Sequence, residues 1–150
     1  MVKSTQSPRY VCRNRKAHYD YEVLETLEAG IVLTGTEIKS VRNSHISLEG
    51  AFAIVNDGQV TLVNCNIETY KQGNIHNHEP KRQRRLLLKK SEIAKFAEQA
   101  KIKGFTLVPL SVYLVGGLAK IELAVCRGKQ THDKRESIKE KDAKRELRNE

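Results

Sequence analysis

Two hairpin signals constrain the fold of this chain more than any other feature of its sequence. In residues 51–67, Asp57-Gly58 separates two apolar runs, and glycine tolerates the positive φ that tight hairpin turns require. In residues 105–126, Gly116-Gly117 separates two further β-rich runs, and Pro109 predicts an edge or a bulge. We therefore expect antiparallel sheet, with the first hairpin turning one apolar face toward the core, formed by Phe52, Ile54, Val60 and Leu62.

The remaining elements predict a barrel with flanking helices. Residues 18–33 alternate as a half-buried strand does, with a bend near Glu25-Thr26. A helix is expected from Thr34 or Thr36 to Asn43-Ser44, and a second over residues 91–104, capped by Ser91. The predicted order of elements is strand, helix, two strands, loop, helix and two strands. This order predicts a mainly β fold, an OB-fold-like antiparallel β-barrel of the Greek-key type. A flat α+β sheet is the alternative.

Composition divides the chain into three parts. Residues 1–16 carry cations and no acid, which is typical of a flexible basic arm. Residues 17–127 hold the predicted barrel. Residues 128–150 are almost entirely charged and cannot bury enough apolar surface to fold alone, so we expect a tail that is disordered in the free protein and becomes helical on a polyanion. A merely solubilising tail is the alternative.

The charge balance points to a polyanionic partner. Lys and Arg number 27 against 18 Asp and Glu, giving a net charge of +9. A membrane is disfavoured as partner, because the sequence has no long apolar segment and no lipidation motif. The start of the chain has no apolar core typical of a secretory signal, and the three cysteines form no C-x-x-C pair. These features predict a cytoplasmic protein with reduced thiols.

Residues 73–90, GNIHNHEPKRQRRLLLKK, form the most informative stretch for function. A run of cations follows a polar loop, and Glu79 is the only acid nearby in sequence, so local ion pairs are not expected to neutralise the run. Arginine clusters suit phosphate oxygens, and Asn and His suit base edges. The apolar run at 86–88 is expected to attach this loop to the core. The phosphate-contact candidates are Lys39, Arg42, Arg82, Arg84 and Arg85, with Asn74, Asn77 and His78 as base-contact candidates.

Catalytic and metal chemistry find little support. His76 and His78 lie two residues apart, but no Cys pair or acidic cluster completes a metal-binding set. No nucleophile elbow, P-loop or dinucleotide fingerprint occurs. We therefore expect no catalytic residue, no metal and no cofactor. Three hypotheses remain: an RNA-binding module, a hydrolase acting on RNA, and a structural component of a ribosomal subunit.

Three motifs together resemble the SmpB family, the protein partner of transfer-messenger RNA (SsrA RNA) in bacterial ribosome rescue. They are EAG-x4-GTE-x-KS-x-R at 28–42, NH-x-P-x-R-x-R-x-LLL at 77–88, and GK-x3-DKR at 128–135. Each motif alone is weak, but the combination is highly specific. The resemblance extends from about Asn14 to about Glu146.

The resemblance implies an OB-fold that binds the tRNA-like domain of transfer-messenger RNA and delivers it to the A site of a stalled ribosome for trans-translation. The partners would be this RNA and the ribosome, with neither DNA nor membrane, and one monomer would bind one RNA. The family's RNA contacts fall on Tyr21, Glu28, Leu87 and Lys89, although some members carry Asn at the last of these positions. Glu37 belongs to the same motif as Glu28 and is a further RNA-site candidate.

The resemblance also gives the tail a function. It would occupy the decoding centre and the empty mRNA channel, in place of the missing codon–anticodon pairing. His132 stands where the family carries Tyr or His. The matched tail positions are Gly128, Lys129, His132, Asp133, Lys134 and Arg135.

Overall fold

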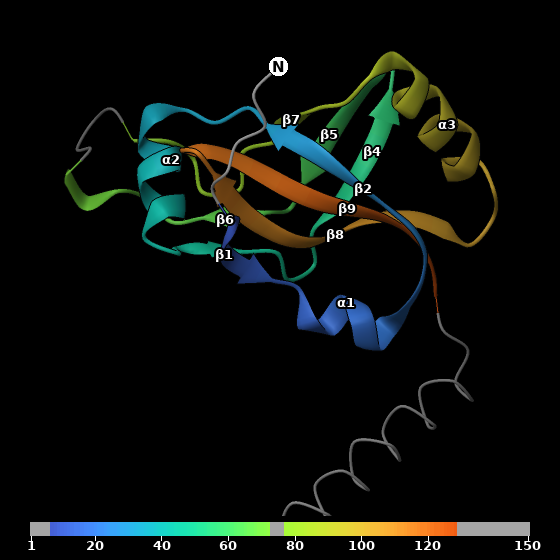
Figure 1. Ribbon diagram of the computed structural model, residues 1–150, viewed down its shortest axis with the longest axis horizontal. Coiled ribbons are helices and arrows are strands. Elements are labelled where there is room, and N and C mark those ends of the chain that lie inside the picture. Colours follow the sequence, from blue (N-terminus) through green and yellow to red (C-terminus); the bar gives the residue numbers. More distant parts are fainter. Residues whose placement is uncertain (1–6, 73–76, 129–150) are drawn as a thin grey trace, which may run out of the picture.

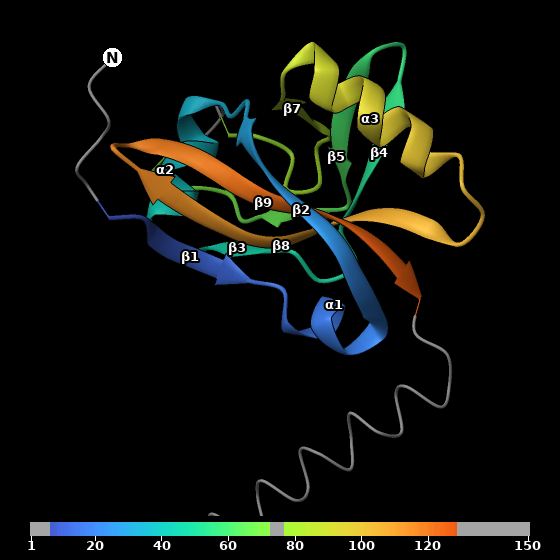
Figure 2. The ribbon, with the colours of Figure 1, turned by 45° about the vertical axis from the view of Figure 1, so that its right-hand side comes forward.

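The strands close on themselves. In the computed structural model, which describes residues 7–72 and 77–128, one sheet has the strand order β1-β8-β4-β5-β7-β2-β9, and β8 also pairs with β9. Six strands therefore form a closed antiparallel ring, and β1 is added outside it along β8 (Figures 1 and 2). A closed ring removes the exposed edges that a flat sheet would present. The mainly β, OB-like architecture is confirmed.

The elements follow one another with short connections along most of the chain. Their bounds, in order, are β1 Arg9–Arg13, α1 Arg15–Asp20, β2 Tyr21–Ile31, α2 Gly35–Arg42, β3 Ile46–Ser47, β4 Phe52–Asn56, β5 Gln59–Val63, β6 Asn66–Ile67, β7 Arg84–Leu87, α3 Lys90–Ala100, β8 Phe105–Val115 and β9 Leu118–Gly128. The short strands β3 and β6 pair with each other in a second sheet. Figures 1 and 2 place α2 and α3 at opposite ends of the ring.

Both hairpins form where the glycine signals predict them. Asp57 and Gly58 have φ of 50° and 73° and join β4 to β5, while Gly116 and Gly117 join β8 to β9. The predicted irregularity at Pro109 is also confirmed, because the β8–β9 register shifts between Pro109 and Ser111. The two glycine turns therefore predicted the positions and pairing of four of the six ring strands.

The predicted inner face of the first hairpin is confirmed for Val60 and Leu62 and wrong for Phe52 and Ile54. Its two-residue turn sets Val55 opposite Val60 and Ala53 opposite Leu62, so these four residues share the inner face. Phe52 and Ile54 lie on the other face and are exposed. The error shifted one strand by one residue, which moves every side chain of that strand to the opposite face.

The N-terminal part is more ordered than a flexible arm over residues 1–16 would be. Arg9–Arg13 form β1, which pairs antiparallel with β8. Asn14 then caps α1 by accepting a hydrogen bond from the Ala17 amide at 3.2 Å, and its side-chain nitrogen donates to the Pro109 carbonyl at 2.9 Å. The strand predicted over residues 18–33 consequently begins at Tyr21, after the helix, and ends at Ile31.

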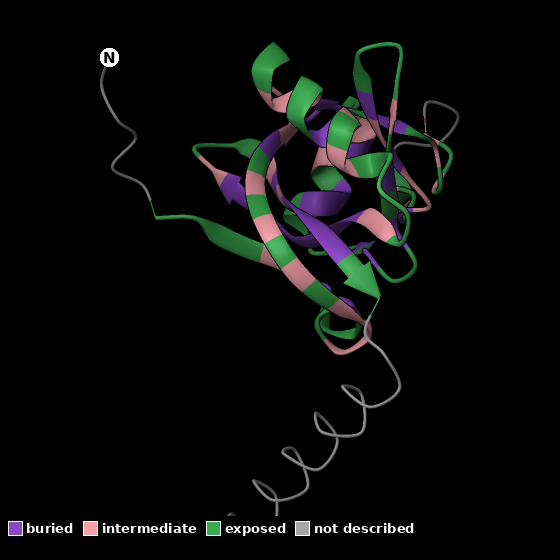
Figure 3. Cartoon of the chain, turned by 90° about the vertical axis from the view of Figure 1, so that its right-hand side faces the viewer, coloured by how far each residue is buried: buried purple, intermediate pink, exposed green. Residues whose placement is uncertain are grey.

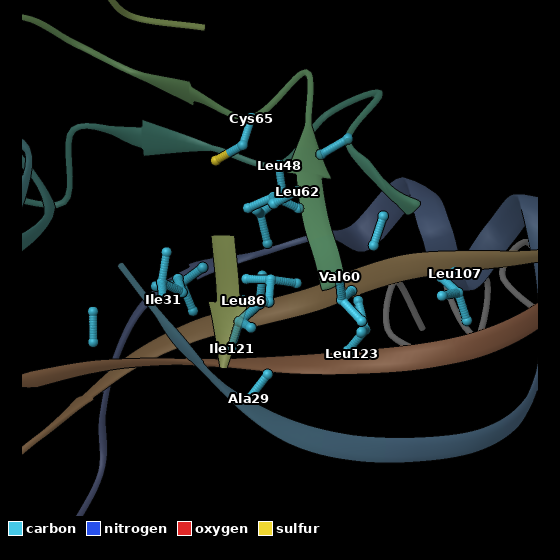
Figure 4. Close-up of a cluster of buried hydrophobic side chains, with 14 of the residues drawn as sticks. Ala29, Ile31, Leu48, Val60, Leu62, Cys65, Leu86, Leu107, Ile121 and Leu123 are labelled. Carbon is cyan, nitrogen blue, oxygen red and sulfur yellow. The ribbon is translucent and has the colours of Figure 1, made fainter. Parts of the chain in front are cut away.

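One continuous apolar cluster fills the ring. It takes residues from every strand of the ring and includes Val60, Leu62, Leu86, Ile121 and Leu123, all at most 2% exposed (Figure 4). Phe96 of α3 and Val41 of α2 are buried in the same cluster from outside the sheet. The buried cysteines Cys65 and Cys126 behave as small apolar residues, as predicted.

A strand replaces part of the predicted long loop. Residues 84–87 form β7, which pairs with both β5 and β2 and so completes the ring between the two halves of the chain. Its alternation buries Arg84 and Leu86 and exposes Arg85 and Leu87. Leu86 therefore attaches this segment to the core, as expected of the apolar run, but Leu87 is 53% exposed.

The two longer helices begin with acidic caps. In α2, the Glu37 carboxylate accepts the Thr34 amide at 2.9 Å, which confirms Thr34 as the start. In α3, Glu92 accepts the Lys89 amide at 2.9 Å, so the helix begins at Lys90 and the expected cap at Ser91 is wrong. An acidic side chain near a helix N-terminus also complements the helix dipole.

Candidate nucleic-acid interface

A buried ion-pair network lies beneath the arginine run. The Glu37 carboxylate of α2 accepts from Arg82 Nη2 at 2.5 Å and from Arg84 Nε at 2.5 Å. Burial raises the pKa of this carboxyl, but the hydrogen bonds from Arg82, the Thr34 amide and Arg84 outweigh burial and hold the pKa at about 2. Glu37 is therefore ionised throughout the physiological range.

Three RNA-contact candidates, Glu37, Arg82 and Arg84, belong to this network, and two of them are too deeply buried to reach RNA in this structure. Glu37 and Arg84 are both 0% exposed, and Arg84 also donates to the Cys65 carbonyl at 2.8 Å and the Pro80 carbonyl at 3.0 Å. The sequence led us to expect no neutralisation by acids nearby in the chain, and the acid that pairs with Arg82 and Arg84 is indeed a distant one. The acid comes from α2, 47 residues away along the chain from Arg84.

The polar loop before the run is held by its own side chains. His78 Nε2 donates to the Ile67 carbonyl at 2.9 Å, because a carbonyl can only accept, and the Thr36 hydroxyl lies 2.8 Å from Nδ1. Asn77 makes reciprocal hydrogen bonds with the backbone amide and carbonyl of Tyr70. Both side chains are half-buried and use these polar atoms internally, so they position the loop. Asn74 lies outside the described residues.

Other cations face solvent. Lys39 and Arg42 project from α2, and the Lys39 ammonium lies 5.3 Å from the centre of the Tyr70 ring. Arg85 is exposed on β7, and Lys89 is exposed just before α3. Arg82 is intermediate: its side chain is 37% exposed although it pairs with Glu37. Lys39, Arg42, Arg85 and Lys89 are therefore the predicted cations best placed to meet phosphates.

Strand β2 carries the second group of candidates along its outer face. Its residues alternate between exposed and half-buried for most of its length (Figure 3). Glu28 is exposed and accepts a hydrogen bond from the Tyr113 hydroxyl. Leu87 of β7 stands opposite Gly30, two residues beyond Glu28, and would lie 3.5 Å from a Cβ placed there. Glu28 and Leu87 thus lie near the same end of β2, and Lys89 follows Leu87 by two residues.

Tyr21 lies at the other end of the same strand. It is half-buried, packs against the small cluster around Ala17 and Val108, and stands opposite Gly128, the last residue of β9. The tail therefore leaves the folded part beside Tyr21. Gly128 is exposed, and the other tail candidates, Lys129, His132, Asp133, Lys134 and Arg135, lie outside the described residues.

Sequence reasoning missed an aromatic group next to Glu28. Tyr113 and Tyr10 pack with ring centres 5.3 Å apart, and Arg13 Cζ lies 4.3 Å from the centre of the Tyr10 ring. Burial, the hydrogen bond to Glu28 and its charge raise the pKa of Tyr113, so its hydroxyl remains a donor. The short apolar run Tyr10-Val11-Cys12 between Arg9 and Arg13 was the available signal, but the many cations around it obscured it.

The described residues offer little for catalysis. Within 7–72 and 77–128, no three His, Cys, Asp or Glu side chains gather as metal ligands would. Burial raises the pKa of the Cys65 thiol to about 12 and that of Cys126 to about 11, which leaves both as poor nucleophiles. No helix in this part of the chain is long and apolar enough to cross a membrane.

Known proteins resemble this chain over almost its whole length. A family model described as SmpB protein matches residues 11–150. An SsrA-binding protein of Ligilactobacillus salivarius is 52% identical over 99% of this chain and 96% of its own length. One from Streptococcus mutans is 55% identical over 92% of this chain and 89% of its own length. A solved structure described as "tmRNA-SmpB: a journey to the center of the bacterial ribosome" matches with a TM-score of 0.69 and 43% identity, over 84% of this chain and 92% of that one.

Proposed function

The chain belongs to the SmpB family, and on this premise we propose that it binds the tRNA-like domain of transfer-messenger RNA and delivers it to the A site of stalled ribosomes. The relatives it matches are named for SsrA binding, and the matching solved structure is named for the tmRNA–SmpB assembly in the bacterial ribosome. Its place of action would be the bacterial cytoplasm, as a monomer bound to one RNA.

One observation carries the assignment of the RNA site. Glu28, Leu87 and Lys89 are all exposed, and Leu87, which Lys89 follows by two residues, stands opposite Gly30, two residues beyond Glu28 on β2. An exposed leucine can pack against a base or ribose, a lysine meets a phosphate, and a carboxylate accepts from a base amino group. We assign base and ribose contacts to this end of β2 and further phosphate contacts to Lys39, Arg42 and Arg85.

The proposal also assigns different functions to the ring and to the C-terminal residues. The ring, ending at Gly128, would hold the RNA. Residues 129–150 would occupy the decoding centre and the empty mRNA channel. Neither role includes a catalytic step, so purified protein incubated with the RNA should leave it uncleaved. Cleavage that persists through stringent purification would support the hydrolase alternative.

A binding titration tests the RNA assignment. We expect full-length protein to bind transfer-messenger RNA in preference to an ordinary tRNA competitor. If Lys39, Arg42, Arg85 and Lys89 each neutralise one phosphate, counterion release predicts about a 100-fold loss of affinity between about 50 and about 200 mM salt. Equal and weak binding to both RNAs would contradict the proposal and indicate a generic basic domain.

Replacing Glu28 with glutamine tests the end of β2. The change keeps the shape but weakens the acceptor, so we expect about a 10-fold loss of affinity for the RNA, the magnitude of one good base contact. The matched control is Glu25→Gln on the same strand, whose carboxylate is already held by Lys95 and Gln99 of α3. Equal affinities of both variants and the native protein would remove Glu28 from the site.

A further inference from the structure

A polar row crosses four strands on the outer face of the ring. Arg13 of β1 stands opposite Ser111 of β8, and Ser111 stands opposite Glu122 of β9. Glu122 in turn stands opposite Glu28 of β2. Directly opposed residues project to the same face of a sheet. The row therefore runs from a cation through a hydroxyl to two carboxylates.

An aromatic stack adjoins this row. Tyr10 and Tyr113 form the next opposed pair on the same face, and their rings are in contact. The Arg13 guanidinium carbon lies 4.3 Å from the centre of the Tyr10 ring, and the Tyr10 and Tyr113 rings are tilted by 47° to each other. Tyr113, Tyr10 and Arg13 thus form a contiguous group, and arginine guanidinium groups are surfaces on which RNA bases stack.

The row and the stack border a hollow of about 320 Å³. One of the residues that line it, Ser111, is only 5% exposed, and its Oγ has no hydrogen-bond partner anywhere in residues 7–72 and 77–128. A buried hydroxyl without a partner costs free energy, so Ser111 is an unsatisfied polar group in the wall of the hollow. The lining residues are Tyr10, Arg13, Arg15, His18, Leu110, Ser111 and Glu122.

We propose that this hollow binds a single unstacked guanosine nucleotide of the RNA. Glu122 can only accept hydrogen bonds, and among the four RNA bases guanine alone presents two adjacent donors, N1–H and the 2-amino group. The base stacks on the Arg13 plane, and Arg15 and His18 at the rim meet the phosphate.

This contact extends the proposed function, on which it rests only for the identity of the RNA. Glu28 links the two sites, because it takes part in the polar row and also lies beside Leu87. The hollow would then hold a base that has left the stack while the end of β2 contacts a neighbouring base and ribose. RNA-binding proteins obtain sequence specificity mainly from such unstacked bases.

The test titrates the four nucleoside monophosphates and inorganic phosphate into the full-length protein labelled for NMR. GMP should shift the amide signals of Arg13, Ser111 and Glu122, with an affinity about 10-fold above that for UMP. Glu122→Gln should abolish this preference. Tyr10→Leu should lower the affinity for all four nucleotides about 10-fold, because it removes the aromatic ring beneath Arg13. Glu98→Gln on α3 is the matched control, and the spectrum of each variant verifies its fold.

The outcomes separate this inference from the proposed function. Equal shifts from all nucleotides and from phosphate, or shifts that map elsewhere, would overturn the guanosine site even if transfer-messenger RNA binds tightly. A GMP preference lost only in the Glu122 variant would support the site. If this protein preferred GMP but did not discriminate between transfer-messenger RNA and tRNA, the guanosine site would be supported and the proposed function would be contradicted.

Discussion

Replacing Arg84 with methionine should lower the free energy of unfolding by about 3–5 kcal/mol, because it leaves a buried carboxylate without its buried partner. Arg84 and Glu37 are both fully buried, and Arg84 also provides the hydrogen bonds to the Cys65 and Pro80 carbonyls. Methionine fills much of the same volume, so the loss reports on charge and hydrogen bonding more than on packing. Urea denaturation at neutral pH measures it.

The neighbouring residue provides the control. Arg85→Met changes the same residue type on the same strand but on its exposed face, and surface substitutions usually change stability by less than about 0.5 kcal/mol. Conversely, Arg85→Met should weaken RNA binding at low salt. Equal losses of stability in the two variants would show that the buried ion pair contributes nothing specific to the fold.

Acid provides a second readout of the same network. The pKa of Glu37 is lowered from 4.5 to about 2 in the folded protein. A lowered pKa means that this contribution to stability is fully present above pH 4.5 and is lost progressively as the pH falls toward 2. The native protein should therefore lose stability over this interval more steeply than the Arg84 variant.

Removing residues 129–150 should abolish ribosome rescue and leave the affinity for transfer-messenger RNA within about 3-fold, because the two ends of the chain have separate roles under the proposed function. The structure places the cut after Gly128. Gly128 pairs with Tyr21, and Arg127 forms an ion pair with Glu22, so an earlier cut would also damage β9. Binding titration and a trans-translation assay measure the two activities.

A point variant separates the effect of one tail side chain from the effect of the tail's length. His132→Ala keeps the full length and removes the one ring matched to the family's aromatic position, so it should reduce rescue without changing RNA affinity. A collapse of RNA binding on truncation would contradict the division, because it would make the tail part of the primary RNA site.

The hairpins and the barrel class could be predicted because their signals are local. Asp57-Gly58 and Gly116-Gly117 specify turns through backbone conformation alone, which a sequence displays directly. The same turn fixed the register that exposes Phe52 and Ile54, so that error was avoidable. Strands β1 and β7 were missed because they are short and depend on pairing with β8, β5 and β2, which are distant in sequence.

The candidate site likewise has residues that the sequence predicted and features that it did not. The family resemblance implied Glu28, Leu87 and Lys89 as RNA contacts, and in the structure Leu87 stands opposite Gly30, two residues beyond Glu28. The sequence did not predict which arginines are exposed. No residue close to Arg84 in the sequence indicates that its partner is Glu37. The sequence also does not indicate that strand alternation turns Arg84 inward while Arg85 faces solvent. The Tyr10–Arg13 stack depends on the pairing of β1 with β8 and was equally hidden.

Strand β9 determines how the molecule would bear mechanical load. It is hydrogen-bonded along almost its whole length to β2 on one side and β8 on the other, both antiparallel to it. Tension applied at residue 128 along the strand would act on both ladders in shear, so many hydrogen bonds would have to break at once rather than one after another. A pull on the tail would thus reach the ring as a rigid displacement, and the ring would move its bound RNA with it before it unravelled.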